Sequence, residues 1–144
     1  SMSLNNVYVR TLKPSELFNG GRSAITWDVV DLMRDDRSAR KGEARWTCAR
    51  AETVYGFAVW WDAQLQPGIS LSTAPGSPRT HWEQLYFPLA TPITLKTGED
   101  IQVMLRSRSS EAAGTHLAWT ATHFDTKGRQ IVRQALDLDK GFLP

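Results

Sequence analysis

Apolar and polar side chains largely alternate on both sides of one glycine in Ile93-Thr94-Leu95-Lys96-Thr97-Gly98-Glu99-Asp100-Ile101-Gln102-Val103-Met104-Leu105. Alternation with a period of two is typical of a β-strand that has one face toward a core. The glycine stands where a tight reversal needs a residue in the left-handed conformation. This segment therefore predicts two strands, Ile93 to Lys96 and Ile101 to Leu105, joined by a short turn.

Short segments of the same kind recur along the chain. We predict further strands at Val7 to Arg10, Ile25 to Val29, Tyr55 to Trp61, Leu117 to Phe124 and Gln130 to Ala135. Turn residues separate them, as in Asn19-Gly20-Gly21 and Asp125-Thr126-Lys127-Gly128. No long segment has the 3.6-residue period of a helix, and Pro14 to Phe18 is expected to form a single helical turn. The fold class predicted is all-β, a barrel-like or sandwich-like single domain with mainly antiparallel strands.

Charged residues occupy the tract from Arg34 to Gly42, which cannot bury much surface. We expect it to be a solvated hairpin tip, with an anion-binding loop as the alternative. The Glu99-Asp100 pair lies in a turn, so its carboxylates are also expected to be solvated.

Composition narrows the class of protein. A length of 144 residues suits one domain. The chain has 17 basic and 15 acidic residues, a balance that points to neither a nucleic acid nor a membrane as partner. A single cysteine, Cys48, and the lack of a secretory leader predict a cytoplasmic protein. Residues 1–4 look like a cloning remnant, so the predicted domain covers residues 5–144.

Free-standing catalysis has little support in the residues themselves. His116 and His123 are seven positions apart in or beside one predicted strand, so they fall on opposite faces and cannot share a metal there. The usual nucleophile, dinucleotide and phosphate-loop motifs do not occur. We expect no metal, no cofactor and no catalytic residue in this chain.

Both faces of the predicted strand from Tyr55 to Trp61 are apolar. A strand with one face in water should alternate, so both faces are expected to be covered, either by two walls of this domain or by a partner. Tyr55, Phe57 and Trp61 share one face and are candidate residues of an interface with another domain.

A specific motif follows that strand. Leu71-Ser72-Thr73 leads into Thr80-His81-Trp82, and Glu83-Gln84, Phe87-Pro88-Leu89 and the Leu95-to-Glu99 turn come after it. This ordered set, from about Tyr55 through Gly98, resembles the C-terminal β-barrel domain of the protein arginine methyltransferases, whose loop reads Thr-His-Trp. The remaining segments match that barrel by strand pattern alone.

The resemblance implies a divided enzyme. In this family a separate domain binds S-adenosylmethionine and supplies the paired glutamates, and neither the glycine-rich cofactor loop nor the double-glutamate loop occurs in this sequence. The barrel supplies one wall of the substrate groove. By position, Thr80, His81 and Trp82 would contact an arginine-containing protein substrate, and His81 would also pair with an acidic residue of the other domain. The chain is expected to be inactive alone and to need that domain in the same or another chain.

Two other interpretations stay open from the residues. One is a stand-alone protein-interaction domain that has lost catalysis. The other is a carbohydrate-binding β-sandwich, suggested by six tryptophans. Trp27, Trp60 and Trp119 have the apolar neighbours of core residues, whereas Trp46 and Trp61 are undecided. The helical arm through which the family's subunits pair has no counterpart here, so a monomer or weak self-association is expected.

Overall fold

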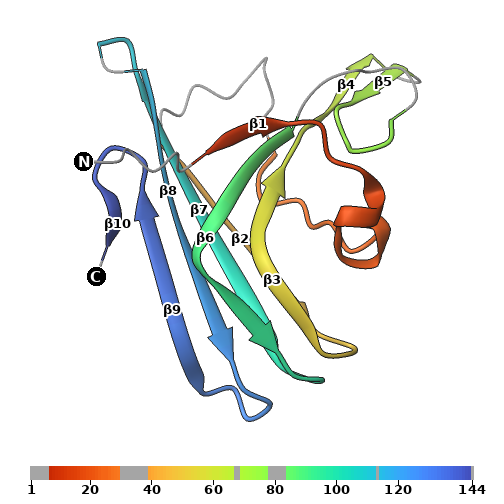
Figure 1. Ribbon diagram of the computed structural model, residues 1–144. Helices are drawn as coiled ribbons and strands as arrows, with labels where there is room; N and C mark the ends of the chain where they lie inside the picture. Colours follow the sequence, from red (N-terminus) through yellow and green to blue (C-terminus); the bar gives the residue numbers. More distant parts are fainter. Residues whose placement is uncertain (1–6, 30–38, 67–68, 78–83, 113, 144) are drawn as a thin grey trace. The chain divides into compact units, whose positions relative to one another are not determined.

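The computed structural model describes residues 7–29, 39–66, 69–77, 84–112 and 114–143. Within them the chain is almost entirely β-structure, with two short 3-10 helices (Figure 1). In chain order the elements are β1 (Tyr8–Arg10), η1 (Pro14–Glu16), η2 (Phe18–Gly21), β2 (Ala39–Thr47), β3 (Glu52–Val59), β4 (Asp62–Gln66), β5 (Ile69–Ser72), β6 (Gln84–Leu95), β7 (Asp100–Ser110), β8 (Gly114–Phe124), β9 (Gln130–Asp137) and β10 (Gly141–Leu143). The all-β class predicted from the sequence is confirmed. No helix in the described ranges has the length and apolar character needed to cross a bilayer.

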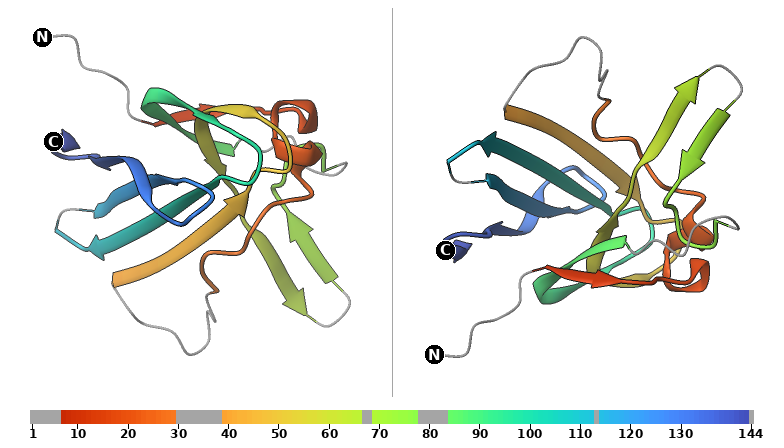
Figure 2. Two further views of the ribbon diagram at one scale, coloured as in Figure 1. Left: turned by 90° about the horizontal axis from the view of Figure 1, so that it is seen from below. Right: turned by 90° about the horizontal axis from the view of Figure 1, so that it is seen from above.

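The largest sheet has the strand order β10-β9-β8-β7-β2, and its printed pairs are all antiparallel. These strands lie side by side in Figure 2. Leucine, isoleucine, valine and tryptophan side chains of β7, β8 and β9 are buried on one face: Ile101, Val103, Leu105, Trp119 and Leu136. Because they occupy alternate positions of long strands, their burial also fixes the register of the sheet.

A second sheet has the order β1-β6-β3, and β4 pairs with β5 in a separate hairpin. The chain forms two compact units, residues 1–24 with 56–89 and residues 25–55 with 90–144. The first unit contains the hairpin β4–β5, the helices and the start of β6, and Phe87 and Leu12 are buried within it. The second unit contains the five-stranded sheet.

The predicted turns are confirmed where the structure describes them. Gly98 joins β6 to β7 with φ at +84°, and Gly128 joins β8 to β9 with φ at +78°. Both angles lie in the left-handed region, which glycine adopts without steric cost. The helical turn expected near Pro14 is η1, a single turn of 3-10 helix.

Two predictions in the second unit are wrong. Residues 25–29 do not form a strand, and residues 39–42, expected in a solvated tip, begin strand β2. Only alternate side chains of β2 face solvent, so a strand can carry its charges there without burying them. A Cβ on Gly42 would lie 1.7 Å from the carbonyl oxygen of Trp27. The backbone at Trp27 therefore lies directly against strand β2 at Gly42. The rest of the charged tract lies outside the described residues.

Strand β3 covers most of the doubly apolar segment but ends at Val59, before Trp60 and Trp61. A Cβ on Gly56 would lie 2.4 Å from the carbonyl oxygen of Phe87, so this glycine permits the close approach of β3 to β6. The Phe57 ring stacks on Phe87, with centroids 5.0 Å apart. Apart from the exposed Tyr55, the side chains of β3 are partly buried on both of its faces.

The described tryptophans differ in how far they are exposed to solvent. Trp119 is 1% exposed and lies at the centre of the large sheet, as predicted for a core residue. Trp27 and Trp60 are only half-buried. Of the two undecided rings, Trp46 is half-buried on β2 and Trp61 is exposed.

Candidate functional site

Thr80, His81 and Trp82 lie outside the described residues, which stop at Ser77 and resume at Gln84. The structure therefore shows how the two ends of the motif segment are held. One end follows β5 and the other begins β6, and both belong to the first unit (Figure 1).

Gln84 anchors the end that follows the motif. Its side-chain nitrogen donates to the carbonyl oxygen of Thr73 at 2.9 Å, and its side-chain oxygen accepts from the backbone N–H of Leu12 at 2.8 Å. The side chain is 3% exposed. One buried amide thus ties the two ends of the motif segment to each other and to the stretch between β1 and η1. A buried amide without these partners would lower the stability of the fold. Gln84 therefore favours this one arrangement of the two ends.

Thr73 anchors the end that precedes the motif. Its backbone N–H donates to the carbonyl oxygen of Trp61 at 3.0 Å, and its hydroxyl accepts from the N–H of Trp61 at 3.0 Å. Thr73 is 2% exposed. Strand β4 begins directly after Trp61, so the threonine attaches the motif segment to the base of the β4–β5 hairpin.

The chain between Thr73 and Ser77 makes a tight turn. Ser77 N–H donates to the carbonyl oxygen of Ala74 at 3.1 Å, and Gly76 has φ at +80°. A Cβ on Gly76 would lie 2.9 Å from Pro14 of η1. The short helix therefore supports the start of the motif segment, and a larger residue would disturb that contact.

Aromatic side chains surround the start of β6. Tyr8 of β1 lies opposite Tyr86 of β6, and the Arg10 guanidinium stands over the Tyr86 ring, 5.7 Å from its centroid. Burial raises the pKa of the Tyr86 phenol, and the charge of Arg10 opposes that rise. The phenol is therefore a neutral hydrogen-bonding group at neutral pH.

The three candidate interface residues on β3 and after it differ in exposure. Tyr55 is 64% exposed and Trp61 is 45% exposed, so two of the three rings are open to a partner. Phe57 is half-buried against Phe87.

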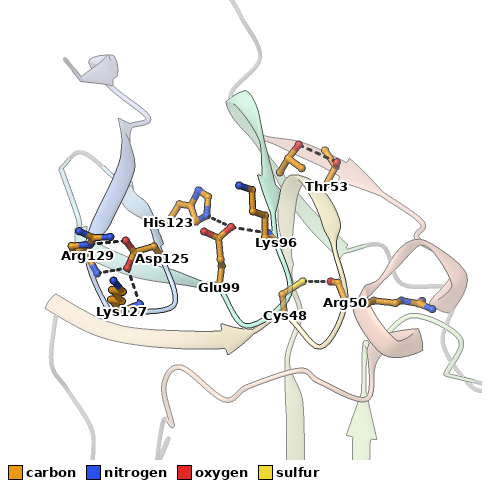
Figure 3. Close-up of polar contacts among 10 residues, drawn as sticks. Cys48, Arg50, Thr53, Lys96, Glu99, His123, Asp125, Lys127 and Arg129 are labelled. Carbon is orange, nitrogen blue, oxygen red and sulfur yellow. Dashed lines mark hydrogen bonds and ion pairs between the residues drawn. The ribbon is translucent and has the colours of Figure 1, made fainter.

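The second unit contains a buried ion pair that the sequence prediction missed. His123 Nε2 and Glu99 Oε1 are 3.1 Å apart, and the two side chains are 7% and 8% exposed (Figure 3). The expectation of a solvated Glu99 is therefore wrong. The backbone N–H of Lys96 donates to Glu99 at 2.7 Å and holds the pKa of that carboxyl below its ordinary value, with a smaller contribution from His123. The pair joins the β6–β7 turn to β8 and is part of the core.

His116 and His123 occupy opposite faces of β8, as their spacing predicts: His116 contacts Asp139 near the surface. Within the described ranges, no three histidine, cysteine, aspartate or glutamate side chains gather as metal ligands would.

In the sequence, Thr73 and Gln84 stand on either side of the Thr-His-Trp motif without a pattern that marks them as anchors. Their roles come from partners that lie 12 and 72 positions away, Trp61 and Leu12. The available signal was a polar residue placed just where an apolar run begins.

Comparison with known proteins identifies the family. The chain matches a family model described as the arginine methyltransferase oligomerization subdomain over residues 1–132. The chain belongs to the arginine methyltransferase family. Its matched part is the C-terminal barrel subdomain of those enzymes.

Relatives of this arginine methyltransferase domain are much longer than the chain. Protein arginine N-methyltransferase 2 of Homo sapiens is 30% identical over 98 residues, which cover 64% of the chain and 23% of that protein. Arginine N(omega)-methyltransferase of Streptomyces achromogenes is 40% identical over 75 residues, covering 52% of the chain and 21% of that protein. A probable histone-arginine methyltransferase 1.3 of Arabidopsis thaliana is 33% identical over 77 residues, covering 51% and 14%. The matches thus span a quarter or less of each relative.

Proposed function

We propose that this domain forms one wall of the substrate groove of an arginine methyltransferase and acts with a separate S-adenosylmethionine-binding domain, in the same or another chain. The supporting observation is the buried pair Thr73 and Gln84, which holds both ends of the segment that carries Thr80-His81-Trp82. A segment fixed at both ends can present its side chains in defined positions, as substrate orientation requires. Membership of the family supports the same role.

Each motif side chain has chemistry that suits an arginine substrate. Trp82 offers a flat ring on which a guanidinium can lie, an attraction worth about 0.5–2 kcal/mol depending on desolvation. A histidine such as His81 can donate a hydrogen bond to a carboxylate of the other domain, and protonation would strengthen that contact. Thr80 adds a hydroxyl that can donate or accept beside them.

S-adenosylmethionine is assigned to the other domain. The cofactor supplies the methyl group, and this chain's sequence lacks the glycine-rich loop that would cradle it. The part played by this domain is therefore to orient the substrate and to exclude water from one side of the groove. Tyr55 and Trp61, both exposed, are the described residues that suit contact with the other domain.

The alternatives differ in how well they fit. A stand-alone interaction domain that lost catalysis uses the same surfaces and differs only in lacking the partner domain. The carbohydrate-binding alternative has less support than the proposed function, because the chain belongs to a methyltransferase family.

A second candidate substrate is arginine itself. The Streptomyces relative is named an arginine N(omega)-methyltransferase, whereas the human relative is named for protein arginine. We favour an arginine-containing protein because most of the relatives named here carry that substrate in their names.

A chimera tests the proposal. This chain would replace the matching segment of the Streptomyces relative, and methyl transfer from labelled S-adenosylmethionine would be measured on an arginine-glycine peptide and on free arginine. We expect transfer by the chimera, none by the chain alone, and a loss of at least about tenfold when His81 or Trp82 becomes alanine. Transfer by the chain alone, or full activity of the His81→Ala and Trp82→Ala chimeras, would overturn the proposal. The preferred substrate of the active chimera decides between protein arginine and free arginine.

The proposal also includes the cellular compartment and the self-association of the domain. A single free cysteine, Cys48, is buried, which suits a reducing cytoplasmic compartment. The family model is described by its oligomerization role, which supports self-association of this domain.

A further inference from the structure

We propose that the outer face of the five-stranded sheet binds an acidic segment of a partner protein. The surface consists of Lys41 on β2 and Arg106 and Arg108 on β7, and we call it the basic face. All three side chains are exposed. The proposal goes beyond the substrate groove, because a surface of this charge repels arginine-rich peptides.

The sheet register brings the three cations together. Lys41 is directly opposite Arg106, so their side chains share one face about 5 Å apart at Cβ. Arg108 is two residues beyond Arg106 on the same strand and therefore on the same face, about 7 Å away. His116 is directly opposite Arg108 and extends the face onto β8, which lies beside β7 in Figure 2.

None of these three cations has an ion-pair partner within the described ranges, where the paired arginines are Arg40, Arg45, Arg50 and Arg129. The nearby carboxylates on this face have other contacts: Glu43 accepts from Gln102 at 2.8 Å, and Asp139 contacts His116. Asp137 accepts from the N–H of Asp139 at 2.9 Å. Like charges directly opposite each other in a sheet are destabilising. The basic face therefore costs stability that an anionic partner would restore.

Protection of a sheet edge does not explain the cluster. β2 is an edge strand, where a lysine such as Lys41 discourages unwanted strand pairing. Arg106 and Arg108, however, lie on β7, which is paired with β2 on one side and β8 on the other. Charges on an interior strand have no edge to protect.

The geometry favours an extended acidic peptide over a nucleic acid. Alternate side chains of an extended chain repeat about every 7 Å, the spacing of Arg106 and Arg108. Single-stranded nucleic acids need exposed aromatic rings on which bases stack. In the part of the chain that the structure describes, the large exposed aromatic side chains are Tyr8, Tyr55 and Trp61, which lie on β1, on β3 and just after β3.

Binding is tested with a fluorescent peptide in which five glutamates alternate with serines. The double variant Arg106→Gln/Arg108→Gln should bind it about tenfold more weakly than the unchanged 144-residue chain. The control variant Lys13→Gln/Lys127→Gln removes the same charge from exposed residues outside this sheet face and should change the affinity by less than about twofold. An equal loss in both variants would show a net-charge effect and overturn the proposal.

The partner class is tested with probes of matched charge. A peptide with the five glutamates in one block, a thymidine oligonucleotide with five phosphates, and phosphatidylserine vesicles should each bind more weakly than the alternating peptide. Equal or tighter binding of any of them would overturn an extended acidic segment as the ligand.

A stability measurement tests separately whether the cations of the basic face repel one another. Lys41→Glu places an anion opposite Arg106, so it should raise the melting temperature by about 1–3 °C while it weakens peptide binding. A lowered melting temperature would show that the cations do not repel one another and would overturn the proposal.

Discussion

Gln84 connects three separated stretches of chain through one buried amide, and this explains why a polar residue begins strand β6. Its oxygen serves Leu12 and its nitrogen serves Thr73, so an apolar residue of the same size would leave both backbone groups without partners. At the level of single residues, the motif segment is held by hydrogen bonds more than by apolar packing.

Replacement of Gln84 by leucine should lower the free energy of unfolding by about 2–4 kcal/mol, because two buried backbone groups lose their partners. Urea unfolding of the isolated chain measures this. Gln102→Leu is the matched control, since Gln102 binds Glu43 at an exposed site, and it should cost less than about 1 kcal/mol. Equal effects of the two changes would contradict the anchoring role of Gln84.

Glu99 gives stability a specific pH dependence. Its pKa is lowered in the folded chain, so the unfolded chain binds the proton more readily. Its contribution is present above the ordinary carboxyl pKa of about 4.5 and is lost as pH falls from there through the lower native pKa. The pKa values of Asp100, held down by Thr47 and Arg45, and of Asp125, held down by the N–H of Arg129, act in the same direction.

Unfolding followed from about pH 7 to about pH 3 should therefore show stability falling in the acid range. Glu99→Gln should be less stable at neutral pH, and its stability should fall less steeply below about pH 4.5 because one of the titrating groups is gone. Parallel acid curves for the variant and the unchanged chain would show that Glu99 does not contribute.

Strand β3 approaches β6 so closely that its middle residue has no room for a side chain. A Cβ on Gly56 would lie 2.4 Å from the Phe87 carbonyl oxygen and 2.6 Å from the Tyr86 hydroxyl. At the scale of whole strands, this contact requires a glycine at the middle of β3.

Gly56→Ala should destabilise the chain by about 1–3 kcal/mol, because a backbone oxygen cannot move aside as a flexible side chain would. Thermal unfolding measures the change. Tyr55→Ala is the control, because Tyr55 is the preceding residue and its ring is exposed. It should change the free energy of unfolding by no more than about 0.5 kcal/mol. A well-tolerated Gly56→Ala would contradict the close approach of the two strands.

At the scale of the whole molecule, the proposal that another domain binds the cofactor leads to two predictions. The isolated chain should not bind S-adenosylmethionine, which titration calorimetry measures. Saturable binding at one site with micromolar affinity would place the cofactor in this chain and contradict the assignment to another domain.

His81→Ala should change the stability of the isolated chain by no more than about 0.5 kcal/mol, because the partner proposed for His81 belongs to the other domain. Urea unfolding measures it, and in the chimera the same change should lower methyl transfer. A loss above about 2 kcal/mol in the isolated chain would identify His81 as a buried structural residue instead.

The sequence by itself determined the all-β class, the turns at Gly98 and Gly128, the burial of Trp119 and the family, because these depend on local alternation, on backbone preference and on an ordered motif. It failed at residues 25–29, whose alternation is typical of a strand although none forms there, and at β2, whose charged residues are also typical of a solvated tip. Only the tertiary structure decided the partners of Gln84, the burial of Glu99 against His123 and the assembly of the basic face. Each of these joins residues from separate strands or turns, and strand register and chain reversal, rather than local sequence, bring such residues together.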